Sequence, residues 1–249
     1  MDILKDILYT NKKVSKNAIN SLKDNWLIIF TGLFYSLATI ILYILLPHFW
    51  ILAGLVLVVC TSALISNYLY LINCIISRNK FDLQDFKEGF GIYLRKVWGI
   101  SFIGWVASLI INTLVMPIFS RGYYPMGLGV ILNFLAIILV NALPEVMYQK
   151  HYNPWESITY TIEFIRDNWI EWFIPNIILA GALYLFTGNF LSSVFNYYIQ
   201  FEFTFFRPRT LILYFVGQII FSFTMIYRGY LFEILSTSNR RKRLFMREF

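Results

Sequence analysis

Six stretches without a charged residue, each about as long as one membrane span, dominate this sequence. They are Leu27–Pro47, Phe49–Ser77, Val97–Ser120, Gly122–Pro144, Trp172–Phe201 and Thr210–Tyr227. A helix needs about 20 apolar residues to cross the hydrocarbon core, whereas a barrel strand needs about ten of alternating polarity. The last stretch is long enough if it continues to about Phe232, with Arg228 reaching toward the headgroups. We therefore predict an all-α polytopic membrane protein with six transmembrane helices in a single domain, residues 1–249.

The low content of charged residues supports this class. The chain is 58% hydrophobic and only 14% charged, whereas a soluble domain carries about a quarter charged residues because its surface must be solvated. The formal net charge is +7, but the basic residues lie between the apolar stretches rather than along one face. That distribution is typical of a membrane orientation signal and argues against nucleic acid as a partner.

The basic residues also predict the orientation. Of the 21 Lys and Arg residues, five precede the first stretch, five lie in the second connection, two in the fourth and five in the C-terminal tail. These 17 fall on one side of the membrane if every stretch crosses it, and only Arg121, Arg207 and Arg209 fall on the other. Cytoplasmic loops carry the excess of Lys and Arg. We expect an integral protein of the cytoplasmic membrane with both termini in the cytoplasm.

A short motif recurs before the first, third and fifth stretches. Its copies are Ser21-Leu-Lys-Asp-Asn-Trp26, Tyr93-Leu-Arg-Lys-Val-Trp98 and Phe164-Ile-Arg-Asp-Asn-Trp169, with tryptophans 72 and 71 residues apart. A fixed period of this size indicates a duplicated unit. We predict three repeats, about 11–80, 81–152 and 153–239, followed by a basic tail, 240–249. Each repeat would be an amphipathic interfacial helix followed by a transmembrane hairpin.

The segments before these tryptophans have the pattern of amphipathic helices. In the third copy, Trp155, Ile158, Ile162, Ile165 and Trp169 line one face, and Asn153-Pro154-Trp155-Glu156 is a strong start signal. The second copy has a similar apolar stripe that follows the N-cap residue Asp82 and consists of Leu83, Phe86, Phe90, Leu94 and Val97. The stripe of the first copy is shorter and consists of Ile19, Leu22 and Trp26. Such helices either lie in the inner headgroup layer or pack on the bundle as connectors. We favour the first reading.

The membrane-interface anchors predicted from this motif are Trp26, Trp98 and Trp169 with Lys23, Arg95 and Arg166. Tryptophan and basic side chains both prefer the interface. The tail residues Arg240, Arg241, Lys242 and Arg243 would add attraction to anionic lipids of the inner leaflet. We therefore expect the cytoplasmic face, rather than a site inside the membrane, to carry the interaction on which function depends.

Groups that could perform catalysis are few. His48 and His151 fall on opposite sides of the membrane, and no metal-ligand spacing or phosphate-binding glycine loop occurs in the sequence. We predict no catalytic, cofactor or metal site. Asn67 and Asn112 lie nearest mid-span and are the best candidates for a polar pathway, although amides at such positions more often join helices by hydrogen bonds. For Arg228, we expect a local pair with Glu233.

The Asn-Trp copies of the motif carry a resemblance. The pattern in Lys23-Asp24-Asn25-Trp26 and Arg166-Asp167-Asn168-Trp169, followed by a hairpin, resembles a group of poorly characterised bacterial six-helix membrane proteins. More distantly, it is similar to the membrane domain fused to some glycerophosphodiester phosphodiesterases. The second copy departs from the pattern, with Lys96-Val97 in place of Asp-Asn. The resemblance implies a fold and a compartment, but no phosphodiesterase activity.

Three functional hypotheses follow. The first is a non-enzymatic membrane subunit or scaffold that acts with a partner membrane protein in export, transport or immunity. The second is the permease subunit of an ABC-type exporter, in which the 83–97 helix would contact an ATPase; the threefold repeat argues against it. The third is an intramembrane enzyme, which the lack of a catalytic constellation disfavours.

Overall fold

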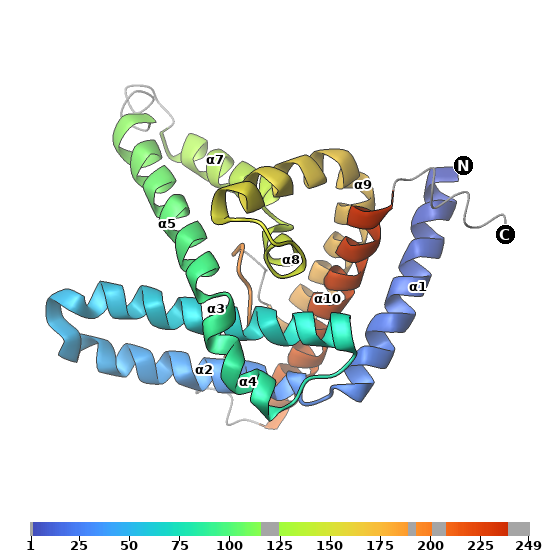
Figure 1. Ribbon diagram of the computed structural model, residues 1–249, viewed down its shortest axis with the longest axis horizontal. Helices are drawn as coiled ribbons and strands as arrows, with labels where there is room; N and C mark the ends of the chain where they lie inside the picture. Colours follow the sequence, from blue (N-terminus) through green and yellow to red (C-terminus); the bar gives the residue numbers. More distant parts are fainter. Residues whose placement is uncertain (1, 116–124, 189–192, 201–207, 239–249) are drawn as a thin grey trace.

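The structure, a computed structural model, describes residues 2–115, 125–188, 193–200 and 208–238. Most of these residues form helices, and no strand occurs among them. The helices are α1 (Asp2–Asp24), α2 (Ile28–Leu45), α3 (Ala53–Arg78), α4 (Leu83–Ile92), α5 (Leu94–Ile110), α7 (Pro125–Leu139), α8 (Leu143–Gln149), α9 (Pro154–Thr187) and α10 (Pro208–Thr237) (Figure 1). The all-α class predicted from the apolar stretches is confirmed.

Four helical segments of the described chain are long and apolar enough to cross a membrane. They are Ile28–Arg78, Leu94–Leu114, Pro154–Thr187 and Leu211–Thr237, and the shorter apolar segment Phe134–Gln149 accompanies them. The first of these contains two helices, α2 and α3, because the chain folds back between them. By length and composition, the fold is therefore consistent with that of a helical membrane protein.

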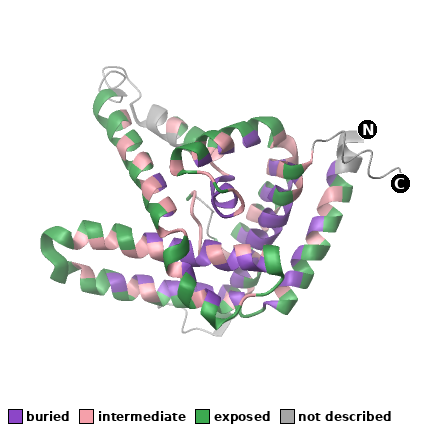
Figure 2. Ribbon diagram, viewed as in Figure 1, coloured by how far each residue is buried: buried purple, intermediate pink, exposed green. Residues whose placement is uncertain are grey.

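The turn between α2 and α3 is a 3-10 segment, Leu46–Leu52, whose reversal occurs at Trp50 with a positive φ of 46°. In Figure 1 this hairpin extends to the left, away from the other helices. Its outer half is exposed, as the green colour in Figure 2 shows. Trp50 and Ile51 at the tip are almost fully accessible. Large apolar side chains at such exposure are stable in hydrocarbon and costly in water.

The core lies where α3, α8, α9 and α10 meet, at the centre of Figure 2. Its fully buried side chains come from all four helices and include Ile72, Met147, Trp172, Ile226 and Phe232. Phe232 contacts the rings of both Phe164 and Trp172. Aromatic pairs of this kind add about 0.5–1.5 kcal/mol beyond the area that they bury. The centre of the bundle is thus packed like the interior of a soluble protein.

Helix α1 packs along α10 at the right of Figure 1. Its buried residues Ile7, Val14 and Ala18 form a stripe at helical spacing on the side that faces the bundle. Polar contacts support the packing, since the hydroxyl of Tyr227 donates to the side chain of Asn11 at 2.7 Å. For α1, the structure favours a connector packed on the bundle over a helix lying free in the headgroup layer.

The fourth predicted stretch, Gly122–Pro144, is divided. Helix α7 ends at Leu139, and the short helix α8 begins at Leu143 with Pro144 in its first turn. Proline suits the first turn of a helix, where a backbone N–H would have no partner in the helix. Inside a helix it removes a backbone hydrogen bond and clashes with the preceding turn, so it favours a break before α8. Helix α8 turns into the bundle, where Glu145 and Met147 are buried.

Candidate functional site

The three motif tryptophans lie on the surface of the described chain. Trp26 is in the turn between α1 and α2, Trp98 is in α5, and Trp169 is in α9. Their exposed fractions are 56%, 49% and 60%. Half-exposed indoles on a membrane protein have the amphipathic character that suits the headgroup layer. The exposure is compatible with the predicted anchoring role of all three.

In the first and third copies of the motif, the asparagine before the tryptophan marks a break between two helices. The side-chain amide of Asn25 donates to the carbonyl of Ser21 at 2.9 Å, and that of Asn168 donates to the carbonyl of Phe164 at 3.1 Å. Both bonds reach back four residues, to a carbonyl of the preceding helical turn, and the carbonyl of Ser21 also accepts the backbone N–H of Asn25 at 3.0 Å. Asn168 accordingly leaves the helical conformation inside α9, with φ −127° and ψ 20°.

The second copy lacks this asparagine, and its break lies elsewhere. Helix α4 ends at Ile92 and α5 begins at Leu94, so the interruption falls at Tyr93, five residues before Trp98. The backbone N–H of Tyr93 donates to the hydroxyl of Ser66 at 2.8 Å. The continuous helix that we expected from Leu83 to Val97 is therefore two helices. The hydroxyl of Ser66, in α3, accepts the hydrogen bond from the backbone N–H of Tyr93 that would otherwise have gone to a carbonyl of the preceding helical turn.

The cations of the motif, Lys23, Arg95 and Arg166, are all exposed. Arg166 forms an ion pair with its neighbour Asp167 at 3.1 Å, and both side chains are well over half accessible. Exposed pairs of this kind contribute little to stability. These three cations are available to surface partners. The predicted basic tail, Arg240 to Arg243, lies outside the described residues.

The apolar faces of the three amphipathic segments differ in what they contact. In the second segment, Phe86 and Phe90 pack against Phe34 of α2. In the third, Ile165 is buried, but Trp155 and Ile162 of the predicted stripe are exposed. The first half of α9 therefore has apolar surface left for the headgroup layer.

Four polar side chains join the ends of α1 and α3 to α10 in what we call the polar junction: Ser21, Asn25, Asn79 and Tyr230. The hydroxyls of Ser21 and Tyr230 are 2.8 Å apart, and Tyr230 donates to the side-chain oxygen of Asn79 at 3.1 Å. The amide of Asn25 also donates to the carbonyl of Asn79 at 2.8 Å. Asn79 has a positive φ of 57°, a left-handed helix end that asparagine tolerates. Asn25 thus connects the first motif copy to the end of α3.

Asn67 and Asn112, the predicted pathway amides, have different surroundings. Asn67 is fully buried, accepts a hydrogen bond from the hydroxyl of Tyr35 at 2.6 Å and donates to the carbonyl of Phe86. Its amide therefore joins α2, α3 and α4, the interhelical role that was the alternative reading. The amide of Asn112 donates to the hydroxyl of Ser108, one turn earlier in the same helical segment, at 3.2 Å, and Asn112 lines a cavity.

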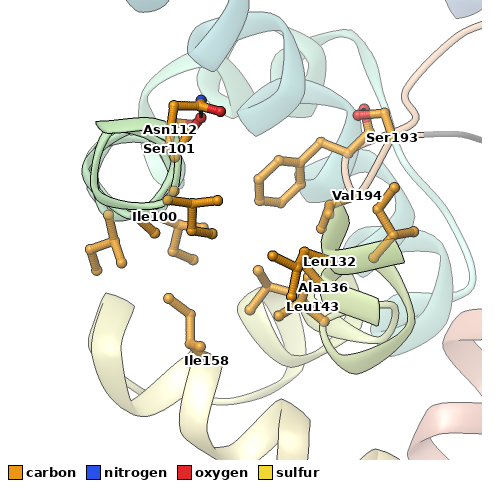
Figure 3. Close-up of a pocket in the computed structure, with 17 residues that line it drawn as sticks. Ile100, Ser101, Asn112, Leu132, Ala136, Leu143, Ile158, Ser193 and Val194 are labelled. Atoms are coloured by element: carbon orange, nitrogen blue, oxygen red, sulfur yellow. Dashed lines mark hydrogen bonds between the residues drawn. The ribbon is translucent and has the colours of Figure 1, made fainter. Parts of the chain in front are cut away.

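That cavity has a volume of about 710 Å³ and lies between α5, α7, the start of α9 and residues 193–195. Its lining holds no charged side chain, and four of its members are polar: Ser101, Ser108, Asn112 and Ser193. Figure 3 shows Ser101, Asn112 and Ser193 on one side of the cavity and Leu132, Ala136 and Ile158 on the other. The space therefore has one wall with polar groups and one that is apolar.

The segment before α10 enters the bundle. The aromatic residues of 196–209 favour a position at the outer interface for this segment, but residues 196–200, its described part before α10, pack inward. The ring of Tyr197 contacts that of the buried Tyr35, and Ile199 is buried. The side chain of Gln218 donates to the carbonyl of Ile199 at 3.2 Å. Residues 201–207 lie outside the described residues.

A buried ion pair between α8 and α10 is the feature that the sequence did not predict. Arg228 donates from Nε to Oε1 of Glu145 at 2.6 Å and from Nη2 to Oε2 at 3.0 Å. It also donates to the carbonyl of Asn141 at 2.7 Å, and its guanidinium lies 5.2 Å from the ring centre of Trp172. The local pair with Glu233 that we expected is wrong. The only signal for the true pair was that both residues interrupt apolar sequence.

Among the described residues, no three His, Cys, Asp or Glu side chains come together as a metal site would require. The chain matches no protein-family model, no curated protein and no solved structure in the comparisons made with them.

Proposed function

We propose that the protein is a non-enzymatic subunit or scaffold of the cytoplasmic membrane, which acts with a partner protein in export, transport or immunity. In this proposal it has six spans, built as three repeats of amphipathic helix and hairpin, with both termini in the cytoplasm. Anionic lipids of the inner leaflet and a partner membrane protein are its ligands on that side. It needs no cofactor.

The polar junction is the observation that carries the proposal. It holds the ends of α1 and α3 to α10 through hydrogen bonds of four side chains, of which Asn25 bonds to the backbone carbonyls of Ser21 and Asn79. A surface fixed in this way is preorganised, so a partner that binds it loses less conformational freedom. The exposed side of α1 adds Lys12, Lys13 and Lys16, which would attract anionic headgroups or an acidic partner.

The interior polar groups support a structural rather than a catalytic role. Arg228 is engaged by Glu145, and Asn67 by Tyr35 and a backbone carbonyl. Groups that satisfy one another hold helices together, whereas a catalytic base must be able to reach a substrate.

Copurification from native membranes tests the scaffold proposal. The Lys12→Gln/Lys13→Gln/Lys16→Gln variant keeps 14 of the 17 predicted cytoplasmic cations against three outside, so its orientation should be preserved. We expect it to lose the proteins that copurify with the wild type, while Asn112→Ala retains them. The proposal is wrong if the triple variant keeps every partner and Asn112→Ala loses them.

Cysteine labelling tests the orientation. In a background with Cys60 and Cys74 replaced by serine, a membrane-impermeant maleimide applied to intact cells should label Ile51→Cys, at the exposed α2–α3 turn, but not Lys16→Cys. After the cells are permeabilised, both positions should react. Labelling of position 16 from outside would overturn the proposed topology.

The alternative, a permease subunit of an ABC-type exporter, is favoured by one observation. The short helix α4 lies between α3 and α5, and Leu83 at its start is exposed, as a contact with an ATPase would require. The two proposals differ in the partner. ATP hydrolysis that copurifies with the wild type and is lost in Leu83→Asp would favour the permease.

A further inference from the structure

We propose that the cavity between α5, α7 and α9 is a binding site for one acyl chain of a membrane lipid. This inference goes beyond the scaffold proposal, because it assigns a ligand class to a site within the spans. It rests on the lining of the cavity, on its length, and on a lining glycine at which an added side chain would meet open space.

The lining selects an apolar, uncharged ligand. Among the described residues it contains no Lys, Arg, Asp or Glu, and its apolar wall includes Leu132, Ala136 and Ile158. An anionic or cationic solute would lose its hydration there and gain no opposite charge, which is strongly unfavourable. The volume of about 710 Å³ is in the range of ligand sites and far above that of a packing defect.

The length of the cavity matches a lipid chain. Its lining runs from Ile100 in α5 to Asn112 in the π-helical turn Ile111–Val115 that follows, which at 1.5 Å per residue is about 18 Å of helix. The hydrocarbon core of a bilayer is about 30 Å thick, so the chains of one leaflet fill about 15 Å. Since Leu94–Leu114 is one of the spanning segments, hydrocarbon chains are the solvent that surrounds this helix. A single chain therefore has the reach and the chemistry to occupy the space.

The polar groups provide a place for the ester end of the chain. Asn112 lies at one end of the lining and close to the end of the described spanning segment Leu94–Leu114, rather than at the mid-span position expected from the sequence. Within the described part of the chain, its amide bonds to Ser108 of the preceding turn at 3.2 Å. Its second N–H can donate to an ester carbonyl. Ile158, in the first turns of α9, lies on the opposite, apolar side in Figure 3. A lipid seated with its ester at Asn112 would direct its chain along Ile103 and Ala107 toward Ile100.

Gly104 shows that the space is part of the fold. Small residues in membrane helices usually allow a neighbouring helix to approach closely, and Gly229 and Gly217 do so here. A side chain added at Gly104, however, would meet nothing within 4 Å. The glycine lines the cavity and so keeps it open rather than closing a helix contact.

Photolabelling in vesicles tests the site. The probe is phosphatidylglycerol with a diazirine in the middle of one acyl chain, diluted into unlabelled phosphatidylglycerol and phosphatidylethanolamine. We expect crosslinks to concentrate on the described lining residues of α5 and α7. Gly104→Leu should lower labelling of these residues by roughly tenfold, the effect of about 1.4 kcal/mol of lost affinity.

The matched control is Gly181→Leu. Gly181 is also a helical glycine with nothing within 4 Å, but it lies outside the cavity, so this variant should label like the wild type. If Gly104→Leu does not fold, Ala107→Val, a smaller addition to the same wall, replaces it. Labelling spread evenly over α5 and the exposed α2–α3 hairpin, or labelling unchanged by the filling variant, would overturn the site. Neither outcome depends on a partner protein.

Discussion

Arg228 and Glu145, 83 residues apart in the sequence, form a two-bond ion pair in the interior of the helical bundle. Their side chains are only 7% and 2% accessible. Each residue neutralises the charge of the other, because a charge buried without a partner is far more costly than a buried pair. The carbonyl of Asn141 and the ring of Trp172 take up the remaining faces of the guanidinium. The pair therefore fixes α8 against α10 and α9.

Removal of either charge should destabilise the fold by about 3–5 kcal/mol, since it leaves the other buried and unpaired. We expect this for Arg228→Leu and for Glu145→Leu, measured by unfolding in mixed detergent micelles. The double variant should lose clearly less than the sum of the two, because it buries no charge. The exposed pair Arg166–Asp167 supplies the control: Arg166→Leu should change stability by less than about 1 kcal/mol. Equal losses at both pairs would contradict the structure.

The two motif asparagines should differ in their contribution. Asn25 is buried and makes three hydrogen bonds, to the carbonyls of Ser21 and Asn79 and from the backbone N–H of Phe81. Asn168 is less buried and makes one, to the carbonyl of Phe164. We expect Asn25→Ala to cost about 1–3 kcal/mol and Asn168→Ala about 0.5–1.5 kcal/mol. Unfolding midpoints of the two variants, compared in one detergent, check the order; the reverse order would refute it.

Local signals in the sequence predicted local structure well. Both predicted helix starts are present as capping boxes, with Asp82 accepting from the N–H of Asp85 and Asn153 from that of Glu156. Caps depend only on residues three apart, so a sequence suffices to find them. The apolar stretches likewise lie mostly in helices, because bilayer thickness fixes their length. The fourth is nevertheless divided between α7 and α8, and the fifth includes the non-helical residues 193–200.

Features that depend on contacts between distant segments could not be predicted in this way. The partner of Arg228 depends on how α8 meets α10, and the break at Tyr93 depends on Ser66 of another helix. The inward path of 193–200 was equally hidden, since aromatic residues such as Tyr197 suit both an interface and a core. The cavity has no sequence signature, because its apolar lining is the same as that of any span.

The stability of the α3–α4 connection should depend on pH through Asp85. Burial raises the pKa of this carboxyl, but the hydrogen bond from Arg78 at 2.6 Å and that from the backbone N–H of Asp82 outweigh it, so the pKa is lower than usual. A group whose pKa is lower in the folded state stabilises the fold above its unfolded value of about 3.9, and this stabilisation is lost as the pH falls through the folded value.

We therefore expect Asp85→Asn to be less stable than the wild type at neutral pH, with the difference shrinking as the pH falls below about 4. Hydrogen exchange of the α4 amides, measured between neutral and acid pH, checks this directly. Asp167→Asn is the control, because Asp167 is exposed and pairs only with its neighbour Arg166. A difference that grows in acid would show that the ionised carboxylate does not stabilise the connection.

Gly229 should be the helical glycine least able to accept a methyl group. A Cβ at this position would overlap the side chain of Ile76 and lie 2.7 Å from the hydroxyl of Tyr148. The backbone carbonyl of Gly229 also accepts a hydrogen bond from the side-chain amide of Gln149 at 2.8 Å. Because α3 and α8 both press on α10 here, Gly229→Ala should destabilise by about 1–3 kcal/mol through overpacking. Gly181→Ala, where the added atom meets nothing, should instead stabilise by about 0.5–1 kcal/mol, because alanine favours the helix interior. The measurement is the free energy of unfolding of both variants under the same conditions, which compares the same substitution at a packed and at an open position. A gain of stability for Gly229→Ala would mean that α3, α8 and α10 do not meet as closely as described.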